Sequence, residues 1–131
     1  MATHCGIAVK TEEGYKTIYC HHDGYESYMY PMLTKNYNSE ERAIDLVSLG
    51  DASCIEERMV PSRESGHSFD NPEDGVCIFY HRDRGECWRE VAPSLFRTKS
   101  ELLDNYYYSY IFEDGKWNAY KNGRKTVVRV D

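Results

Sequence analysis

The sequence lacks any long hydrophobic run, and this absence limits where the protein can act. None of its 131 residues lies in an apolar segment of the roughly 20 residues that a membrane-spanning helix needs. The amino-terminal residues have neither the basic stretch nor the apolar stretch of a secretory signal. We therefore expect no membrane partner and a cytoplasmic location.

Several familiar chemical signatures are also missing. The five cysteines are an odd number and include no Cys-x-x-Cys pair, which argues against a zinc knuckle. We expect reduced thiols, with Cys20 and Cys77 as small core residues. The sequence contains no P-loop, dinucleotide-binding glycine pattern, Gly-x-Ser-x-Gly elbow or His-Glu-x-x-His motif. No common enzyme class is therefore indicated by a motif.

Positive charge is in short supply. The net charge is −6, and an acidic protein gains little from phosphate neutralisation, which argues against non-specific nucleic-acid binding. Residues 38–74 carry ten acids and only three bases, so they hold more than the whole excess of negative charge. This segment is either a solvated helix followed by an acidic loop, or a surface that binds a basic partner.

Hydrophobic spacing and turn residues predict one α+β domain over residues 1–131. We expect an antiparallel sheet of about five or six strands with two or three short helices packed on one face. A long acidic loop is expected at about residues 56–75. The predicted strands are 5–10, 15–22, 76–82, 106–112, 116–120 and 125–130, and the predicted helices are 31–36, 98–105 and one that begins at Asn38 and stops at Gly50.

A short pattern occurs twice, sixty residues apart. Ile-[Tyr/Phe]-x-His-x-Asp is found at residues 18–23 and again at residues 78–83. Since residues i and i+2 of a strand share a face, His21 lies beside Asp23, and His81 beside Asp83. If the two strands are neighbours, the pairs can bind a divalent metal or serve as general acid and base. The alternative is surface histidines followed by turn-capping aspartates.

Tyrosine is abundant, with twelve in the chain. A tyrosine ring offers a stacking surface and a hydroxyl, which suits base stacking and protein interfaces, although tyrosine is also simply a good strand former. The arginines of the run Arg82-Asp83-Arg84-Gly85, with Arg89 and Arg97 downstream, can hold a phosphate unless the neighbouring acids neutralise them. The candidate binding residues are Tyr19, His21, His22, Asp23, Tyr25, Tyr28, Arg82 and Arg84.

The stretch Tyr19-Cys20-His21-His22-Asp23-Gly24-Tyr25 carries a resemblance. It resembles the Tyr-Cys-His-x-Asp-Gly-Tyr signature of small uncharacterised proteins encoded by bacteriophages and prophages. Leu33 and Tyr37 resemble the helix that follows in that family, and Gly50-Asp51-Ala52-Ser53 its Gly-Asp-x-Ser element. The family often has a glycine soon after the signature, where this chain has Ser27-Tyr28-Met29-Tyr30. The resemblance implies a phage origin and a fold, and it supplies no known activity.

These observations favour a binding protein over an enzyme. We expect a phage accessory protein in the cytoplasm of the infected cell that binds and antagonises a host factor, plausibly a defence component. It would act by occluding a host protein or by sequestering a nucleotide signal, without a cofactor. The alternative is a small metal-assisted hydrolase of a nucleotide or phosphodiester, with His21, Asp23, His81 and Asp83 as the metal ligands. A homodimer is open, because the predicted strand 125–130 is a candidate sheet edge.

Overall fold

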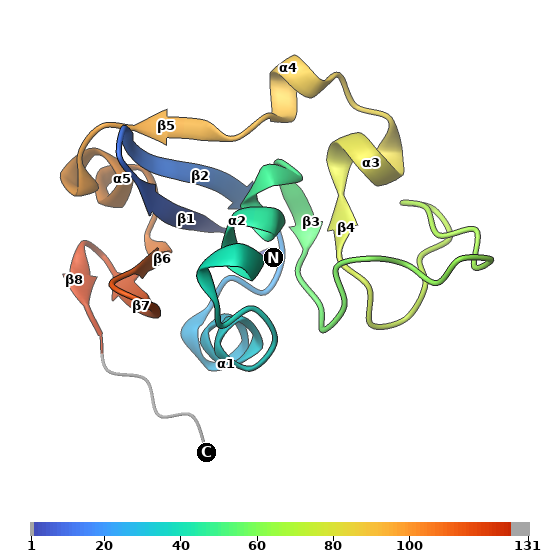
Figure 1. Cartoon of the computed structure of the whole chain (residues 1–131), viewed down its shortest axis with the longest axis horizontal. Helices are drawn as coiled ribbons and strands as arrows, with labels where there is room; N and C mark the ends of the chain where they lie inside the picture. Colours follow the sequence, from blue (N-terminus) through green and yellow to red (C-terminus); the bar gives the residue numbers. More distant parts are fainter. Residues whose placement is uncertain (1, 127–131) are drawn as a thin grey trace.

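A computed structural model describes residues 2–126 and contains one mixed β-sheet with helices against both of its faces (Figure 1). The strands are β1 (Cys5–Thr11), β2 (Gly14–Cys20), β3 (Ala52–Cys54), β4 (Ile78–Phe79), β5 (Ser94–Phe96), β6 (Tyr108–Glu113), β7 (Lys116–Lys121) and β8 (Arg124–Lys125). The helices are α1 (Glu26–Asn36), α2 (Glu40–Ser48), α3 (Tyr80–Arg84), α4 (Trp88–Val91) and α5 (Lys99–Asn105). The strand order is β4-β3-β2-β1-β6-β7-β8, with β5 also pairing with β2.

Strand β1 lies at the centre of the sheet. It pairs antiparallel with β2 through a tight hairpin and parallel with β6, which comes from the far end of the described sequence. Residues 5–9 are all buried, as expected for a strand that is covered on both faces. The hairpin turn leaves Glu12 and Glu13 exposed.

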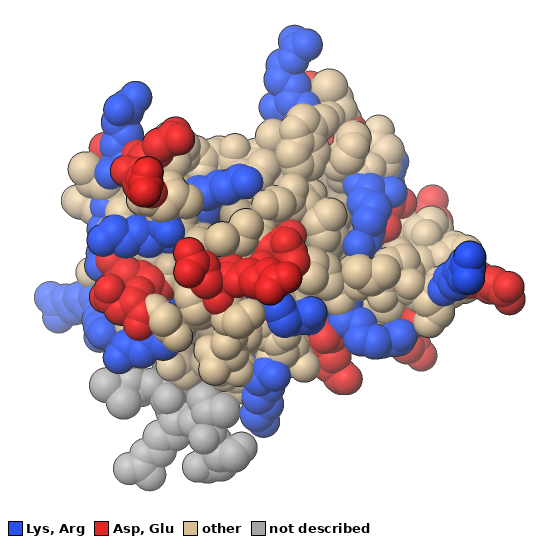
Figure 2. All heavy atoms as spheres, in the orientation of Figure 1, with Lys and Arg blue, Asp and Glu red and all other residues tan. Residues whose placement is uncertain are grey.

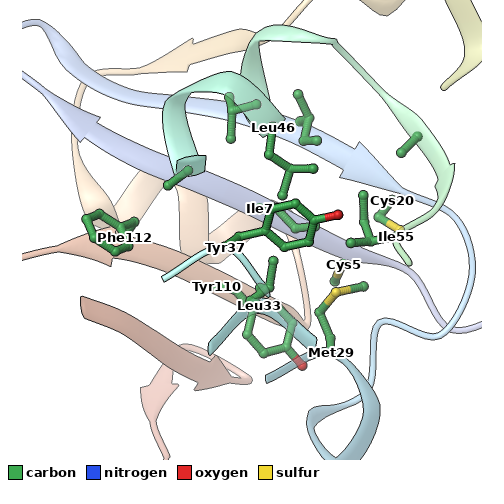
Figure 3. Close-up of a cluster of buried hydrophobic side chains, with 14 of the residues drawn as sticks. Cys5, Ile7, Cys20, Met29, Leu33, Tyr37, Leu46, Ile55, Tyr110 and Phe112 are labelled. Atoms are coloured by element: carbon green, nitrogen blue, oxygen red, sulfur yellow. The ribbon is translucent and has the colours of Figure 1, made fainter. Parts of the chain in front are cut away.

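Helices α1 and α2 cover one face of the sheet and form the larger core with it (Figure 3). Ile7 of β1 and Tyr110 of β6 pack with Leu33 and Leu46 from the two helices. Between these helices the buried hydroxyl of Tyr37 donates to the Glu56 carbonyl at 2.6 Å. Burying such large side chains stabilises the fold by about 1.5–3 kcal/mol each.

Helix α5 packs against the opposite face of the sheet. Its Leu102 joins Ala8 of β1 and Ile111 of β6 in a second, smaller core. Alternation along β1 and β2 also places His4, Gly6 and Tyr19 on the side of Ala8 rather than on the side of α1 and α2. This second face carries the candidate site described below.

Several predictions from the sequence are confirmed. The hairpin of residues 5–22 is present as β1 and β2, and Asp114 and Asn122 sit in left-handed turns before Gly115 and Gly123. The predicted helix 98–105 is α5. The helix predicted from Asn38 is α2, and the Ser39 side chain accepts a hydrogen bond from the backbone of Arg42, as an N-cap does.

Other predictions were wrong in extent. Over residues 2–126 the sheet is mixed and has eight strands, and its helices lie on both faces rather than one. Helix α1 begins at Glu26, not near Pro31, so Pro31 lies inside it. The short elements β3, α4 and β5 were not predicted. Of the predicted strand 125–130, Lys125 belongs to β8, and residues 127–130 lie outside the described part of the chain.

The predicted strand 76–82 was also wrong, because only Ile78 and Phe79 within this range form a strand. Helix α3 begins at Tyr80, and the Asp83 carboxylate accepts the backbone N–H of Phe79 at 2.8 Å. That bond satisfies a donor that a strand would have used and turns the chain into a helical turn. Gly85, with φ of 78°, then ends the helix.

The same carboxylate ties down the long acidic loop. Arg82 forms an ion pair with Asp83 at 2.8 Å and donates to the carbonyls of Met59 and Cys77. The ring of His67 is nearly buried, and its Nε2 lies 3.3 Å from a carboxylate oxygen of Asp83. Its Nδ1 accepts the backbone N–H of Glu73. Residues from both ends of the loop are therefore held against α3.

Acidic side chains are concentrated on the face of the molecule that carries α1 and α2 (Figure 2). Figure 2 shows acidic side chains near the middle of the face that carries α1 and α2, with lysines and arginines around them. Glu40, Glu41 and Asp45 of α2 are all exposed. Within residues 2–126, no helix is both long enough and apolar enough to cross a membrane.

We predict that Asp83→Asn lowers the free energy of unfolding by about 3 kcal/mol, because it leaves a largely buried arginine without its counter-charge. The control is Glu86→Gln, which removes the partner of the exposed Arg84 at 3.2 Å and should cost less than about 1 kcal/mol. Both values come from urea unfolding at neutral pH. Equal losses in the two variants would contradict the assignment.

The cost of Asp83→Asn should also depend on pH. Burial alone raises the pKa of Asp83, but the Arg82 guanidinium and the Phe79 amide more than offset it and lower the pKa below the ordinary value of an aspartate. A lowered pKa contributes stability at higher pH that is lost as pH falls through the folded-state value. Unfolding measured across acid pH should show the wild type and the variant converging below the ordinary range of an aspartate.

Candidate functional site

The β1–β2 hairpin brings two histidines and a tyrosine together on the second face of the sheet. Cys5 and Cys20 are register partners, so His4 and His21, one residue beyond them, face each other across the hairpin. Their ring centroids are 4.6 Å apart. Tyr19 reaches the same face, since it lies two residues before His21.

The three side chains form a hydrogen-bonded relay. The Tyr19 hydroxyl lies 2.6 Å from Nδ1 of His21 and 2.8 Å from Nδ1 of His4. Nδ1 of His4 is also 3.0 Å from the His21 carbonyl, which can only accept. This geometry favours a proton on Nδ1 of His4, with the Tyr19 hydroxyl donating its own proton to Nδ1 of His21. In their neutral forms, His4 then has a free lone pair on Nε2, whereas His21 has an N–H there.

The surroundings of His21 and Tyr19 shift the pKa of each toward its uncharged form. Burial, followed by the proximity of His22 and His4, lowers the pKa of His21. Burial, followed by the nearby Tyr80, raises the pKa of the Tyr19 hydroxyl. Asp51 holds the backbone of the relay in place, because its carboxylate accepts the backbone N–H of Tyr19 at 2.9 Å. Burial raises the pKa of Asp51, and that hydrogen bond partly offsets the rise.

A hollow of about 370 Å³ adjoins the relay. We call it the aromatic pocket; its lining residues are Ala2, Thr3, His4, Tyr19, Asn105, Tyr106, Tyr107 and Tyr108. Four of the eight are tyrosines and none is an acid, although the chain as a whole is acidic. Its size falls at the lower end of small-molecule sites, and its rings suit a planar ligand.

Gly6 in β1 allows the ring of Tyr106 to pack directly against the sheet beside this pocket. A Cβ at this position would lie 2.5 Å from a ring carbon of Tyr106, so only glycine lets the ring approach the sheet. Tyr106 is half-buried, and Tyr107 next to it is 55% exposed. The pocket therefore has one ring held against β1 and a neighbouring ring that is free to contact a ligand.

The other candidates of the first motif lie around this site or away from it. The exposed ring of His22 stands edge-on to His21, with centroids 4.6 Å apart. Asp23 adopts a left-handed turn with φ of 58°. Tyr25 precedes α1, and its ring lies near that of Tyr28, whose hydroxyl donates to the Ile55 carbonyl. Neither tyrosine lines the aromatic pocket.

The second His-x-Asp pair is not brought to the first. Strand β3 lies between β2 and β4, and His81 and Asp83 are on helix α3, where residues two apart do not share a face. Nδ1 of His81 bonds to the Glu86 carbonyl, and its ring contacts Trp88. Over residues 2–126, no group of three or more histidine, cysteine, aspartate or glutamate side chains is arranged to hold a metal ion.

The two candidate arginines have partners within the chain. Arg82 is held by Asp83 and two carbonyls, as described above. Arg84 lies over the ring of Phe69 at 4.6 Å and pairs with Glu86. The neighbouring acids thus neutralise both arginines, which was the alternative left open by the sequence.

His4 and the pocket tyrosines 106–108 were not among the residues singled out from the sequence as binding candidates. For His4 a signal existed, because extending the predicted hairpin by one pair places it opposite His21. For residues 106–108 the position depends on the parallel pairing of β6 with β1, which joins distant segments. Searches against family models, curated proteins and solved structures found no match.

We predict that Gly6→Ala displaces the Tyr106 ring and lowers the free energy of unfolding by about 1–3 kcal/mol, the usual cost of overpacking. The measurement is urea unfolding of Gly6→Ala, Tyr106→Ala and the double variant. The two changes should not add, since removing the ring makes room for the new methyl group. Strictly additive losses would contradict the close packing of Tyr106 on Gly6.

Proposed function

We propose that the protein is a small accessory binding protein that sequesters a nucleotide in the aromatic pocket. The observation that carries the proposal is the composition of that pocket: four tyrosines and an imidazole surround about 370 Å³, with no carboxylate among the lining residues. Stacking of a base on an aromatic ring contributes about 1–3 kcal/mol. The absence of acids from the lining avoids repulsion of a phosphate, since like charges close together are unfavourable.

Polar groups beside the rings support recognition of a base. Nε2 of His4 is a free acceptor once Nδ1 has been committed to the relay. Asn105 lines the pocket, and its Nδ2 is used within α5 by the Glu101 carbonyl. Its side-chain oxygen is therefore the part of the amide left to contact a ligand. A few polar groups in a mainly aromatic hollow are typical of sites that bind small planar molecules.

The biological role that we propose follows from the resemblance to small phage proteins. A phage accessory protein that holds a nucleotide signal would antagonise the host factor that depends on that signal, such as a component of a defence system. Binding alone accounts for such a role, so no turnover is required. Occlusion of a host protein is the second way in which a protein of this kind can act, and the exposed acids of α2 are where a basic partner would bind.

The test is isothermal titration calorimetry of the purified protein with linear mononucleotides and cyclic nucleotides. We expect at least one to bind, and we expect Tyr107→Ala to weaken its affinity by about 10- to 100-fold, the loss of one base stack. Tyr107→Phe should bind almost normally, because the ring is retained.

Tyr25→Ala is the matched control. Tyr25 is also an exposed tyrosine, at 38%, but it lies outside the pocket, so its removal should leave affinity unchanged. If no nucleotide binds, the proposal fails. If Tyr25→Ala weakens binding as much as Tyr107→Ala does, the ligand is not held in the aromatic pocket.

A further inference from the structure

We propose that the relay also gives the protein an activity, the cleavage of a ribonucleotide phosphodiester by proton transfer between His4 and His21. The cleavage proposal goes beyond binding and rests on the proposed function only in using the aromatic pocket to hold a base. The feature that carries it is the contact of both imidazoles with the Tyr19 hydroxyl, a geometry that favours opposite tautomers on His4 and His21.

The relay presents one proton acceptor and one proton donor side by side. Nε2 of His4 has a lone pair, Nε2 of His21 has a proton, and the ring centroids are 4.6 Å apart. His4 is exposed and His21 is partly exposed. A base and an acid whose ring centroids are this close can serve two oxygens of one phosphodiester.

The substrate must bring its own nucleophile. Among residues 2–126, no serine or cysteine side chain hydrogen-bonds to the imidazole of His4 or His21, so the site has no activated protein nucleophile of the usual kind. A ribonucleotide supplies a 2′-hydroxyl next to its own phosphodiester. The chemical class that fits is therefore RNA or a ribodinucleotide with a 3′-5′ linkage, with one base stacked in the pocket.

The proposed step balances in protons and bonds. The 2′-oxygen attacks phosphorus and gives its proton to Nε2 of His4, while the bond from phosphorus to the 5′-oxygen breaks. The leaving 5′-oxygen takes the proton from Nε2 of His21. At the same time Nδ1 of His4 passes its proton to the Tyr19 oxygen, and Tyr19 passes its own to Nδ1 of His21. The products are a 2′,3′-cyclic phosphate and a free 5′-hydroxyl.

Both imidazoles end the step neutral, with their tautomers exchanged. Neither has to carry a positive charge before the reaction, which agrees with the lowered pKa of His21. Exchange with water at the accessible Nε2 atoms restores the starting tautomers. His4 and His21 are the catalytic residues, and Tyr19 is a positioning residue that moves the compensating proton.

The experiment follows ribodinucleoside monophosphates of all base combinations by chromatography, in the presence of EDTA. We expect a 2′,3′-cyclic phosphate from at least one, and no product from its 2′-deoxy counterpart. His4→Gln and His21→Gln should each lower the rate by about 100-fold or more, the contribution of general acid–base groups. His81→Gln is the matched control, since His81 is an exposed histidine outside the relay, and its rate should equal that of the wild type.

The variant Tyr19→Phe distinguishes the role of the Tyr19 hydroxyl in the relay from the role of its ring in the pocket. The phenyl ring is retained, so KM should stay unchanged, while kcat should fall by about 10-fold or more because the compensating proton has no path. A rise in KM together with weakened binding would assign Tyr19 to the scaffold and overturn its role in the relay, so each variant is also titrated with the non-cleavable 2′-deoxy dinucleotide. Unchanged binding with lost turnover supports the proposal.

The outcomes also separate this inference from the proposed function. A wild-type protein that binds the 2′-deoxy dinucleotide but releases no cyclic phosphate from the ribonucleotide overturns the cleavage and leaves binding in place. Cleavage that persists in His4→Gln or His21→Gln at the wild-type rate overturns the assignment of the two histidines. Absence of any nucleotide binding overturns the proposed function instead.

Discussion

The fold depends on the pairing of β1 with two partners at once. Strand β2 follows β1 directly in the sequence, whereas the parallel neighbour β6 begins only at Tyr108, after all the helices and the long loop. Parallel pairs need a crossover connection, and here the crossover runs from β2 through all five helices. Because β1 is buried on both faces, every other layer is organised around it. Loss of the β1–β6 pair would divide both cores, because each of them contains residues of both strands.

The two faces of the sheet divide the work between them. The face under α1 and α2 holds most of the buried side chains, including Tyr37 and Leu46, and provides stability (Figure 3). The other face has a smaller core under α5; Tyr19 of β2 lies on this face, and His4 and His21 lie next to the strand ends Cys5 and Cys20. Polar side chains placed beside a rigid strand pair are held in fixed positions, whereas those on loops are not. Register pairing of Cys5 with Cys20 places the relay residues opposite each other.

Local signals in the sequence were sufficient for local structure. The hairpin, the Ser39-capped helix and the carboxyl-terminal turns follow from nearby residues and were predicted with useful bounds. Residues 76–82 were not, because their apolar run suits a strand and the Asp83 carboxylate redirects the chain through a hydrogen bond that spacing does not reveal. The site divides in the same way. His21 and Tyr19 were found from a motif, but the pocket tyrosines depend on a long-range parallel pairing, for which one sequence offers no sign.

The aromatic pocket joins residues from distant parts of the chain, and this has a consequence for synthesis. His4 and Tyr19 leave the ribosome early, whereas Tyr106 and Tyr107 follow almost ninety residues later, and β6 must then pair beside β1. A nascent chain that has already formed its hairpin therefore has the relay without the pocket. The proposed nucleotide would therefore find no complete site until β6 has paired with β1, however early the hairpin forms.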